Sequence, residues 1–321
     1  MSITAEQAQW FQRNFQHMVD NVAIAIRGKD TVIELALTCL LSQGHLLLED
    51  NPGTGKTVLA KAVANTVAGT HNRIQFTPDL LPSDLTGIAV FDPRTKTFEF
   101  HKGPVFATIV LADEVNRASP KTQAALLEVM EENTVTVDGT RHEVGHPFMV
   151  VATQNPIEMA GTYRLPEAQL DRFLMKVSVG YPDHDTTVEL LSEASNRDRA
   201  AGVGAMVSTQ AVMQMSEFAN QTYVDPAILD YLSRLATASR AHPHVRVGLS
   251  TRGVLSFVRA AKTWAVAHGR EYVTTDDVRG LAQPLMSHRL LLSPEAQFAG
   301  ANIDDVVASL LASVLAPELR A

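Results

Sequence analysis

Short runs typical of strands, the clearest of them apolar nearly throughout, alternate with helical patterns over the first half of the chain. Such runs occur at residues 45–49, 73–76, 107–111, 148–152 and 176–180. A strand that is apolar nearly throughout suits a parallel sheet with both faces covered. Apolar residues at helical spacing predict helices at 4–27, 30–42, 58–67 and 119–132. The alternation predicts an α/β domain built on a parallel sheet.

Two segments of this half predict β-hairpins instead. Residues 91–101 alternate around Asp-Pro-Arg-Thr-Lys, which is typical of a hairpin that projects from the body of a domain. Residues 134–144 place β-branched residues on either side of Asp138-Gly139, a dipeptide that favours a tight hairpin turn. We therefore expect two hairpins inserted between the strands of the sheet.

Beyond Tyr181-Pro182 the pattern changes to long helical periodicity with little strand signal. Helices are predicted at 186–201, 210–220, 226–240, 251–269, 275–287 and 303–315. We expect two domains, an α/β domain at residues 1–182 and an all-helical domain at residues 183–321.

The composition is that of a globular protein, with 45% hydrophobic residues in 321. Lys and Arg number 27 against 35 Asp and Glu, a formal charge of −8 without any basic run, which argues against a nucleic-acid groove as the main surface. The single cysteine, Cys39, cannot form an intrachain disulfide. No leader pattern and no apolar run near the roughly 18 residues of a membrane span are present, so we expect a cytoplasmic protein.

The stretch Leu46-Leu-Leu-Glu-Asp-Asn-Pro-Gly-Thr-Gly-Lys-Thr-Val58 carries a strand into a glycine-rich turn and then a helix. Gly53 and Gly55 allow close approach of an anion, and the following helix offers unpaired N–H groups and a positive dipole end. Lys56 supplies a charge for the outer phosphates and Thr57 a hydroxyl for Mg²⁺, as in a P-loop. The predicted nucleotide-contacting residues are Asn51, Pro52, Gly53, Thr54, Gly55, Lys56, Thr57 and Val58. Asp50 stands where the pattern has glycine, and a chance glycine-rich turn is the alternative interpretation.

Polar side chains follow two other predicted strands. Asp113 and Glu114 end one strand, and Asn155 follows the next. Ligands in parallel sheets bind outside the carboxyl ends of the strands. Asp113 is thus a candidate Mg²⁺ ligand, Glu114 a candidate base for the attacking water, and Asn155 a candidate for positioning that water. The alternatives are a solvated strand end for the acids and an ordinary turn residue for Asn155.

Two arginines are further candidates. Arg172 is either a structural partner of Asp171 or a guanidinium offered to the phosphate of a neighbouring subunit. Arg252, at the start of a predicted helix in the second domain, either reaches the γ-phosphate or lies on the surface.

These motifs together resemble the AAA+ ATPases, and within them the MoxR family. The resemblance spans about residues 20–292. It rests on the runs that begin Leu111-Ala-Asp-Glu-Val-Asn-Arg117, Val151-Ala-Thr-Gln-Asn155 and Leu165-Pro-Glu-Ala-Gln-Leu-Asp-Arg172, and on Gly248-Leu-Ser-Thr-Arg252 and Gly269-Arg-Glu-Tyr-Val-Thr-Thr-Asp-Asp-Val278. The implied fold is a P-loop NTPase core with a parallel sheet, followed by an all-helical lid.

The resemblance also implies roles for individual residues. Asp113 and Glu114 correspond to the Walker B pair, Asn155 to sensor 1, Arg252 to sensor 2 and Arg172 to the arginine finger. The first hairpin is similar to the helix-2 insert and the second to the hairpin before sensor 1. Arg117 belongs to the family motif without an assigned role, and Thr251 stands where the family is expected to have proline.

The implied activity is Mg²⁺-dependent ATP hydrolysis in a ring, expected to be a hexamer. The resemblance further implies chaperone-like maturation of protein clients, including metal or cofactor insertion, with a separate von Willebrand factor A domain protein as partner. Three alternatives stay open: a nucleic-acid-associated AAA+ motor, an assembly subunit that hardly hydrolyses ATP, and the ATPase subunit of a metal chelatase.

Overall fold

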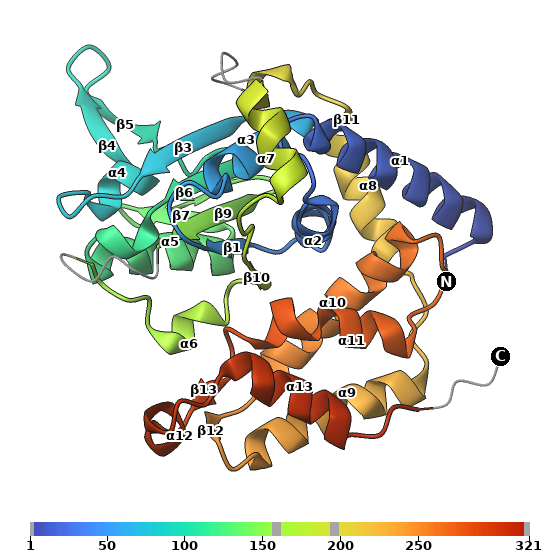
Figure 1. Cartoon of the computed structure of the whole chain (residues 1–321). Helices are drawn as coiled ribbons and strands as arrows, with labels where there is room; N and C mark the ends of the chain where they lie inside the picture. Colours follow the sequence, from blue (N-terminus) through green and yellow to red (C-terminus); the bar gives the residue numbers. More distant parts are fainter. Residues whose placement is uncertain (1–2, 156–161, 193–198, 318–321) are drawn as a thin grey trace. The chain divides into compact units, whose positions relative to one another are not determined.

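The computed structural model describes residues 3–155, 162–192 and 199–317 (Figure 1). Contacts divide the chain into two compact units. We call residues 17–165 and 177–213 the sheet unit, and residues 1–16, 166–176 and 214–321 the helical unit. The sequence predicted a single boundary after residue 182, and that boundary stays a prediction.

A five-stranded sheet forms the core of the sheet unit, in the order β10-β1-β9-β6-β3. Its strands are β1 (Leu46–Glu49), β3 (His71–Gln75), β6 (Ile109–Asp113), β9 (Met149–Gln154) and β10 (Met175–Val177), of which only Val177 is assigned to the sheet unit. The pairs β1–β9, β6–β9 and β3–β6 are parallel, with Leu46 and Leu111 both opposite Val151. Every residue of β6 is buried, as its apolar sequence predicted. The expected parallel sheet is confirmed, and its register brings the carboxyl ends of the strands to one edge.

Helices and short strands complete the sheet unit: α2 (Asp30–Leu41), α3 (Lys56–Thr66), α4 (Pro82–Thr86), η1 (Val115–Arg117), α5 (Pro120–Glu132), α7 (His184–Ser192), η2 (Arg199–Gly202), β2 (Val67–Ala68) and β11 (Val207–Ser208). Helix α1 (Ala5–Ala23) begins in the helical unit and ends here. The Ser119 hydroxyl accepts from the Thr122 N–H and caps α5, with Pro120 at its first position, as predicted. Of the helix expected at 186–201, residues 186–192 lie in α7 and residues 199–201 lie in the 3-10 helix η2; residues 193–198 lie outside the described part.

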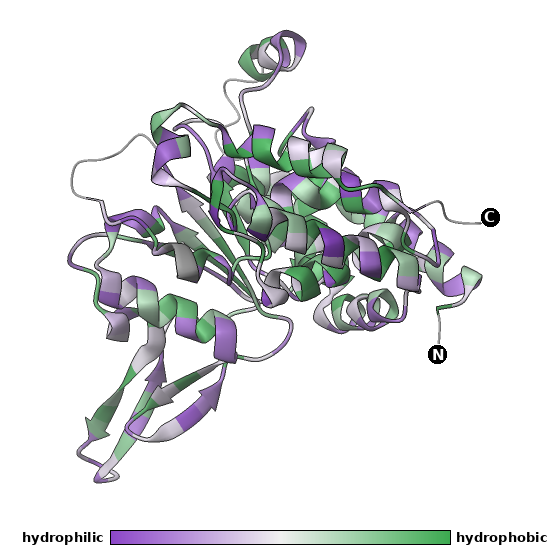
Figure 2. Cartoon of the chain, turned by 90° about the horizontal axis from the view of Figure 1, so that it is seen from below, coloured by the Kyte–Doolittle hydropathy of each residue, from purple (hydrophilic) through white to green (hydrophobic). Residues whose placement is uncertain are grey.

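The two predicted hairpins are present, β4 (Gly87–Asp92) with β5 (Thr97–Lys102) and β7 (Thr134–Val137) with β8 (Thr140–Glu143). Both Asp138 and Gly139 have positive φ, as the tight turn between β7 and β8 requires. Figure 2 shows the hairpins side by side, projecting from the rest of the unit, and the rings of Phe100 and His142 stack with centroids 3.9 Å apart. Phe98, 71% exposed, packs on Phe91 with ring centroids 5.4 Å apart.

The helical unit is built on α6 (Glu167–Leu170), α9 (Pro226–Ala241), α10 (Thr251–Ala267), α11 (Thr275–Met286), α12 (Pro294–Phe298) and α13 (Ile303–Ser313), together with the later part of α8 (Thr209–Asn220). The side chains of Asp225, Ser250, Thr274, Ser293 and Asn302 cap five of these helices. One short antiparallel pair, β12 (Val245–Val247) with β13 (Leu291–Leu292), corrects the expectation of helices alone. Among the described residues, no helix combines the length and apolarity needed to cross a membrane.

Residues 171–174 of the helical unit are held by two buried side chains. Arg289 donates from Nε to Asp171 Oδ1 (2.6 Å), from one terminal nitrogen to the Phe173 carbonyl (2.7 Å) and from the other to the Leu174 carbonyl (3.0 Å). His288 Nε2 lies 3.0 Å from the Phe173 carbonyl, so this nitrogen carries the proton. Burial and the charge of Arg289 put the pKa of His288 well below its usual value, which keeps the imidazole neutral. This clamp fixes the backbone on both sides of Arg172.

Candidate nucleotide-binding site

The turn between β1 and α3 has the backbone of an anion-binding loop. Gly53 and Gly55 have φ of 81° and 92°, backbone angles that residues other than glycine rarely adopt. Gly55 is the N-cap of α3. The first backbone N–H groups of a helix have no acceptor within the helix, and its dipole favours negative charge there. The turn and the start of α3 therefore offer N–H groups to a phosphate.

Lys56 contributes a positive charge inside this turn. Its ammonium group donates to the carbonyl oxygens of Asp50 (2.5 Å) and Asn51 (2.8 Å). The Thr54 hydroxyl also donates to the Asn51 carbonyl, at 3.2 Å. Asn51 thus acts through its backbone oxygen, as an internal support of the turn.

A cavity of about 430 Å³ opens above the turn at the carboxyl edge of the sheet. It is lined by Pro52–Val58 together with Arg73, Gln75, Asp113, Glu114, Thr153, Gln154 and Asn155. The structure therefore brings the predicted residues Lys56, Thr57, Asp113, Glu114 and Asn155 around one space.

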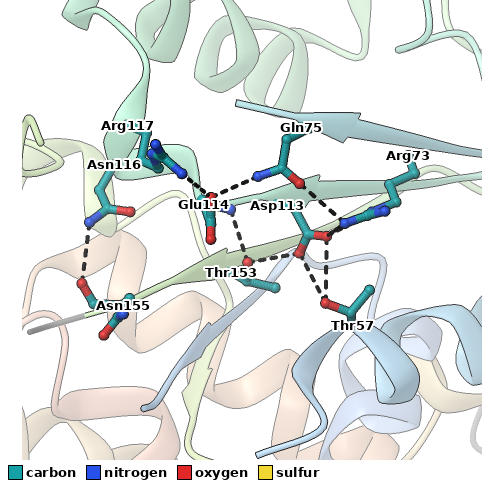
Figure 3. Close-up of polar contacts among 9 residues, drawn as sticks. All are labelled: Thr57, Arg73, Gln75, Asp113, Glu114, Asn116, Arg117, Thr153 and Asn155. Atoms are coloured by element: carbon teal, nitrogen blue, oxygen red, sulfur yellow. Dashed lines mark hydrogen bonds and ion pairs between the residues drawn. The ribbon is translucent and has the colours of Figure 1, made fainter. Parts of the chain in front are cut away.

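Asp113 is only 3% exposed, and its carboxylate is surrounded by donors (Figure 3). Thr153 donates its hydroxyl to Oδ1 at 3.0 Å, and the Arg73 guanidinium lies 2.7 and 2.8 Å from Oδ2. The Thr57 hydroxyl is more distant, 3.4 and 3.5 Å from the two oxygens. The positive charge of Arg73 balances the negative charge of the buried Asp113 carboxylate. Without a partner of opposite charge, burial of this carboxylate would be costly.

Glu114 follows directly, with φ of 57°, a left-handed conformation that is uncommon outside glycine and often marks functional sites. Its backbone N–H donates to the Thr153 hydroxyl at 3.0 Å. Its carboxylate accepts from the Gln75 amide at 2.7 Å and from Arg117 at 2.9 Å (Figure 3). The Glu114 carboxylate is thereby held at the cavity wall by one neighbour from β3 and one from η1.

The sequence reasoning missed Arg73 and Gln75. The pattern contained a signal, because Ile74 between them is buried and alternate strand residues share a face. In the register of β3 with β6, Gln75 lies opposite Asp113. Arg117, whose role the sequence left open, is paired with Glu114 of the same chain.

A second cavity, of about 280 Å³, lies on the other side of the turn. It shares Gly53, Thr54, Gly55 and Val58 with the first cavity, and its remaining wall is formed by Ala25, Ile26, Arg27, Lys29, Val179, Pro182, Leu190 and Arg199. An elongated ligand with one end at Lys56 can cross the turn into this second space. This wall could not be predicted from the sequence, because its residues lie far apart along the chain.

Arg172 and Arg252 belong to the helical unit, Arg172 beside the Arg289 clamp and Arg252 in the first turn of α10. Their expected roles at the γ-phosphate and in a neighbouring subunit stay predictions.

Comparison with known proteins agrees with this geometry. Residues 45–175 match the family model of the ATPase family associated with various cellular activities (AAA), and residues 237–310 match the AAA lid domain. Chaperone MoxR1 of Mycobacterium tuberculosis is 39% identical over 305 residues, covering 92% of this chain and 80% of that protein. The chain belongs to the MoxR family of AAA+ ATPases.

Two further relatives cover nearly the whole of this MoxR-family chain. The uncharacterized protein YeaC of Bacillus subtilis is 42% identical over 302 residues, 94% of each protein. A crystal structure of a Cytophaga hutchinsonii protein, 35% identical, superposes with a TM-score of 0.89 over 98% of each chain. The MoxR-family chain is thus an ATP-hydrolysing enzyme with an α/β core and a lid domain, which confirms the fold and the activity that its motifs predicted.

Proposed function

We propose that this ATPase couples Mg²⁺-dependent ATP hydrolysis to the remodelling or maturation of partner proteins, including the insertion of metals or cofactors. The proposal of ATP hydrolysis rests on one observation, the cavity that is lined by Lys56, Thr57, Asp113, Glu114 and Asn155 together. The similarity to Chaperone MoxR1 supports the part that concerns partner proteins.

The nucleotide spans both cavities in this proposal. Its phosphates lie on the N–H groups of the turn, with the outer phosphates toward Lys56. The base and ribose cross Gly53 and Gly55 into the second cavity, where apolar side chains such as Ile26 and Val179 suit a planar base.

The residues at the Thr57 and Asp113 position fit a magnesium ion, because a hydroxyl and a carboxylate are the hard oxygen donors that Mg²⁺ prefers. A magnesium ion bound there would neutralise charge on the phosphate oxygens. Arg73 already pairs with the Asp113 carboxylate, so a magnesium ion bound there would compete with Arg73 for its oxygens.

Glu114 is the base of the hydrolytic step. A water oxygen attacks the γ-phosphorus, the bond to the oxygen that bridges the β- and γ-phosphates breaks, and the water proton passes to the Glu114 carboxylate. Gln75 and Arg117 hold this carboxylate against the cavity wall, and Asn155 orients the water by hydrogen bonding.

The assembly and its partners complete the proposal. A head-to-tail contact that closes into a hexameric ring would bring Arg172 of one subunit to the nucleotide of the next. The exposed rings of Phe91 and Phe98 on the first hairpin support contact with a protein client in the cytoplasm, with a separate von Willebrand factor A domain protein as adaptor.

Glu114→Gln tests the chemistry, with Glu128→Gln on the exposed face of α5 as control. We expect phosphate release to fall by about a hundredfold or more in Glu114→Gln, with ATP binding retained. Unchanged ATP turnover in Glu114→Gln would show that Glu114 is not the base of the hydrolytic step.

Recovery of a heat-denatured model protein tests the remodelling. Wild-type protein with ATP and Mg²⁺ should increase the recovered activity, and Glu114→Gln should not. Recovery that is independent of ATP would refute the coupling.

A further inference from the structure

Asp50 departs from the P-loop pattern, which has glycine at this position. Its carboxylate links two distant segments of the sheet unit. Oδ1 accepts from the Asn51 N–H at 2.8 Å. Oδ2 accepts from the Ser178 hydroxyl at 3.0 Å and from the Gly180 N–H at 2.5 Å. A glycine at position 50 would have no side chain with which to make these contacts.

Residues 178–182 form one wall of the second cavity. Val179 and Pro182 line that cavity, and Gly180, with φ of 66°, turns the chain between them. The Tyr181 carbonyl accepts from the Lys29 ammonium group at 2.8 Å, and Lys29 also lines the cavity. The wall is therefore attached at two points, to Asp50 on one side and to Lys29 on the other.

The same residue supports the phosphate side through its backbone, because the Asp50 carbonyl accepts from Lys56. Burial raises the pKa of Asp50, but hydrogen bonds from the Gly180 and Asn51 backbone, the Ser178 hydroxyl and the charge of Lys56 bring it below its ordinary value. The side chain is thus an ionised acceptor at neutral pH, and hydrogen bonds to a charged acceptor are stronger than neutral ones.

We propose that Asp50 is a positioning residue that fixes the wall of the nucleoside cavity to the phosphate-binding turn, so that binding of the base and ribose depends on its carboxylate while binding of the phosphates does not. The inference rests on the placement of the nucleotide across both cavities under the proposed function.

Asp50→Asn is the discriminating variant. An asparagine side chain has one acceptor oxygen, so it cannot accept from Asn51 on one side and from Ser178 and Gly180 on the other. Loss of the negative charge near Lys56 favours anion binding, which is opposite to the effect expected from a loosened cavity wall. In Asp50→Asn, the lost negative charge alone would therefore raise the affinity for nucleotide, whereas the lost support of the cavity wall would lower it.

The experiment measures the affinity of the full chain for ADP and for inorganic tripolyphosphate by isothermal titration, at fixed free Mg²⁺. We expect Asp50→Asn to weaken ADP binding about tenfold and to leave tripolyphosphate binding unchanged or slightly tighter. The KM for ATP should rise by the same factor with kcat within twofold. Ser178→Ala, which keeps the Gly180 contact, should show a smaller loss for ADP, and Asp138→Asn at the hairpin turn should show none.

Equal losses for ADP and tripolyphosphate would overturn the proposal, since they would make Asp50 a support of the turn alone. Unchanged ADP binding in Asp50→Asn would overturn it as well, with the nucleotide assignment intact. A wild-type chain that binds tripolyphosphate as tightly as ADP would refute the nucleoside cavity itself, and with it the role of Asp50.

Discussion

Replacement of Arg289 by methionine tests the clamp on residues 171–174. The Arg289 side chain is 2% exposed and that of Asp171 is 22% exposed, so the ion pair is largely buried. The variant removes the partner of Asp171 and the donors to the Phe173, Leu174 and Leu285 carbonyls, while methionine keeps much of the apolar stem.

The expected loss follows from these contacts. Removal of one partner of a buried ion pair typically costs about 3–5 kcal/mol. Asp171 keeps the Ser250 hydroxyl at 2.8 Å and some access to water, which favours the lower end of that range. We therefore expect Arg289→Met to lower the free energy of unfolding by about 3 kcal/mol. Adding Asp171→Asn should recover roughly 1 kcal/mol, because the stranded charge is then gone.

Urea unfolding followed by tryptophan fluorescence measures this loss selectively. The two tryptophans, Trp10 and Trp264, both belong to the helical unit, so their emission reports its unfolding. Arg279→Met, at an exposed position of α11, is the matched control and should lie within about 0.5 kcal/mol of wild type. A loss in Arg289→Met no larger than that of Arg279→Met would refute the clamp.

Three further predictions concern the nucleotide site and the buried histidine. Thr57→Val should raise the Mg²⁺ concentration for half-maximal ATPase activity about tenfold, measured by titration at saturating ATP; an unchanged Mg²⁺ dependence would exclude the hydroxyl as a ligand. Gly55→Ala should weaken ADP binding at least tenfold, because alanine at φ of 92° is strained and its Cβ would lie 3.4 Å from Ile26; titration with ADP decides. His288 is neutral when folded and protonates near pH 6.5 when unfolded, so its stabilisation is complete above that pH and is lost as the pH falls. Between pH 6.5 and 5, the free energy of unfolding of wild type, measured in urea, should fall with pH more steeply than that of His288→Gln. The difference in slope should be up to about 1.4 kcal/mol per pH unit. Equal slopes in the two proteins would contradict a buried neutral His288.

The sequence predicted those features that local chemistry decides. Apolar runs predicted the buried strands, Ser119-Pro120 predicted the start of α5, and Asp138-Gly139 predicted a hairpin turn. Asp113 and Glu114 were found because a parallel sheet brings strand ends to one edge.

The features that were missed depend on single polar residues that meet across long stretches of chain. Asp50 pairs with Gly180 130 residues away, and Arg289 with Asp171 118 residues away. Such pairs leave no periodic trace, because neither partner belongs to a repeating pattern of polar and apolar positions. From the sequence alone, Asp50 is therefore only a departure from the glycine of the pattern, although its carboxylate has three donors.

The stacking of Phe100 on His142 couples the two hairpins to each other. Since Phe100 lies on one hairpin and His142 on the other, neither hairpin can bend away without breaking this contact. The second hairpin continues from α5 through one left-handed residue, Asn133, and α5 follows the turn that holds Glu114 and Arg117. A displacement of the first hairpin would therefore act on the second hairpin, and through Asn133 on α5.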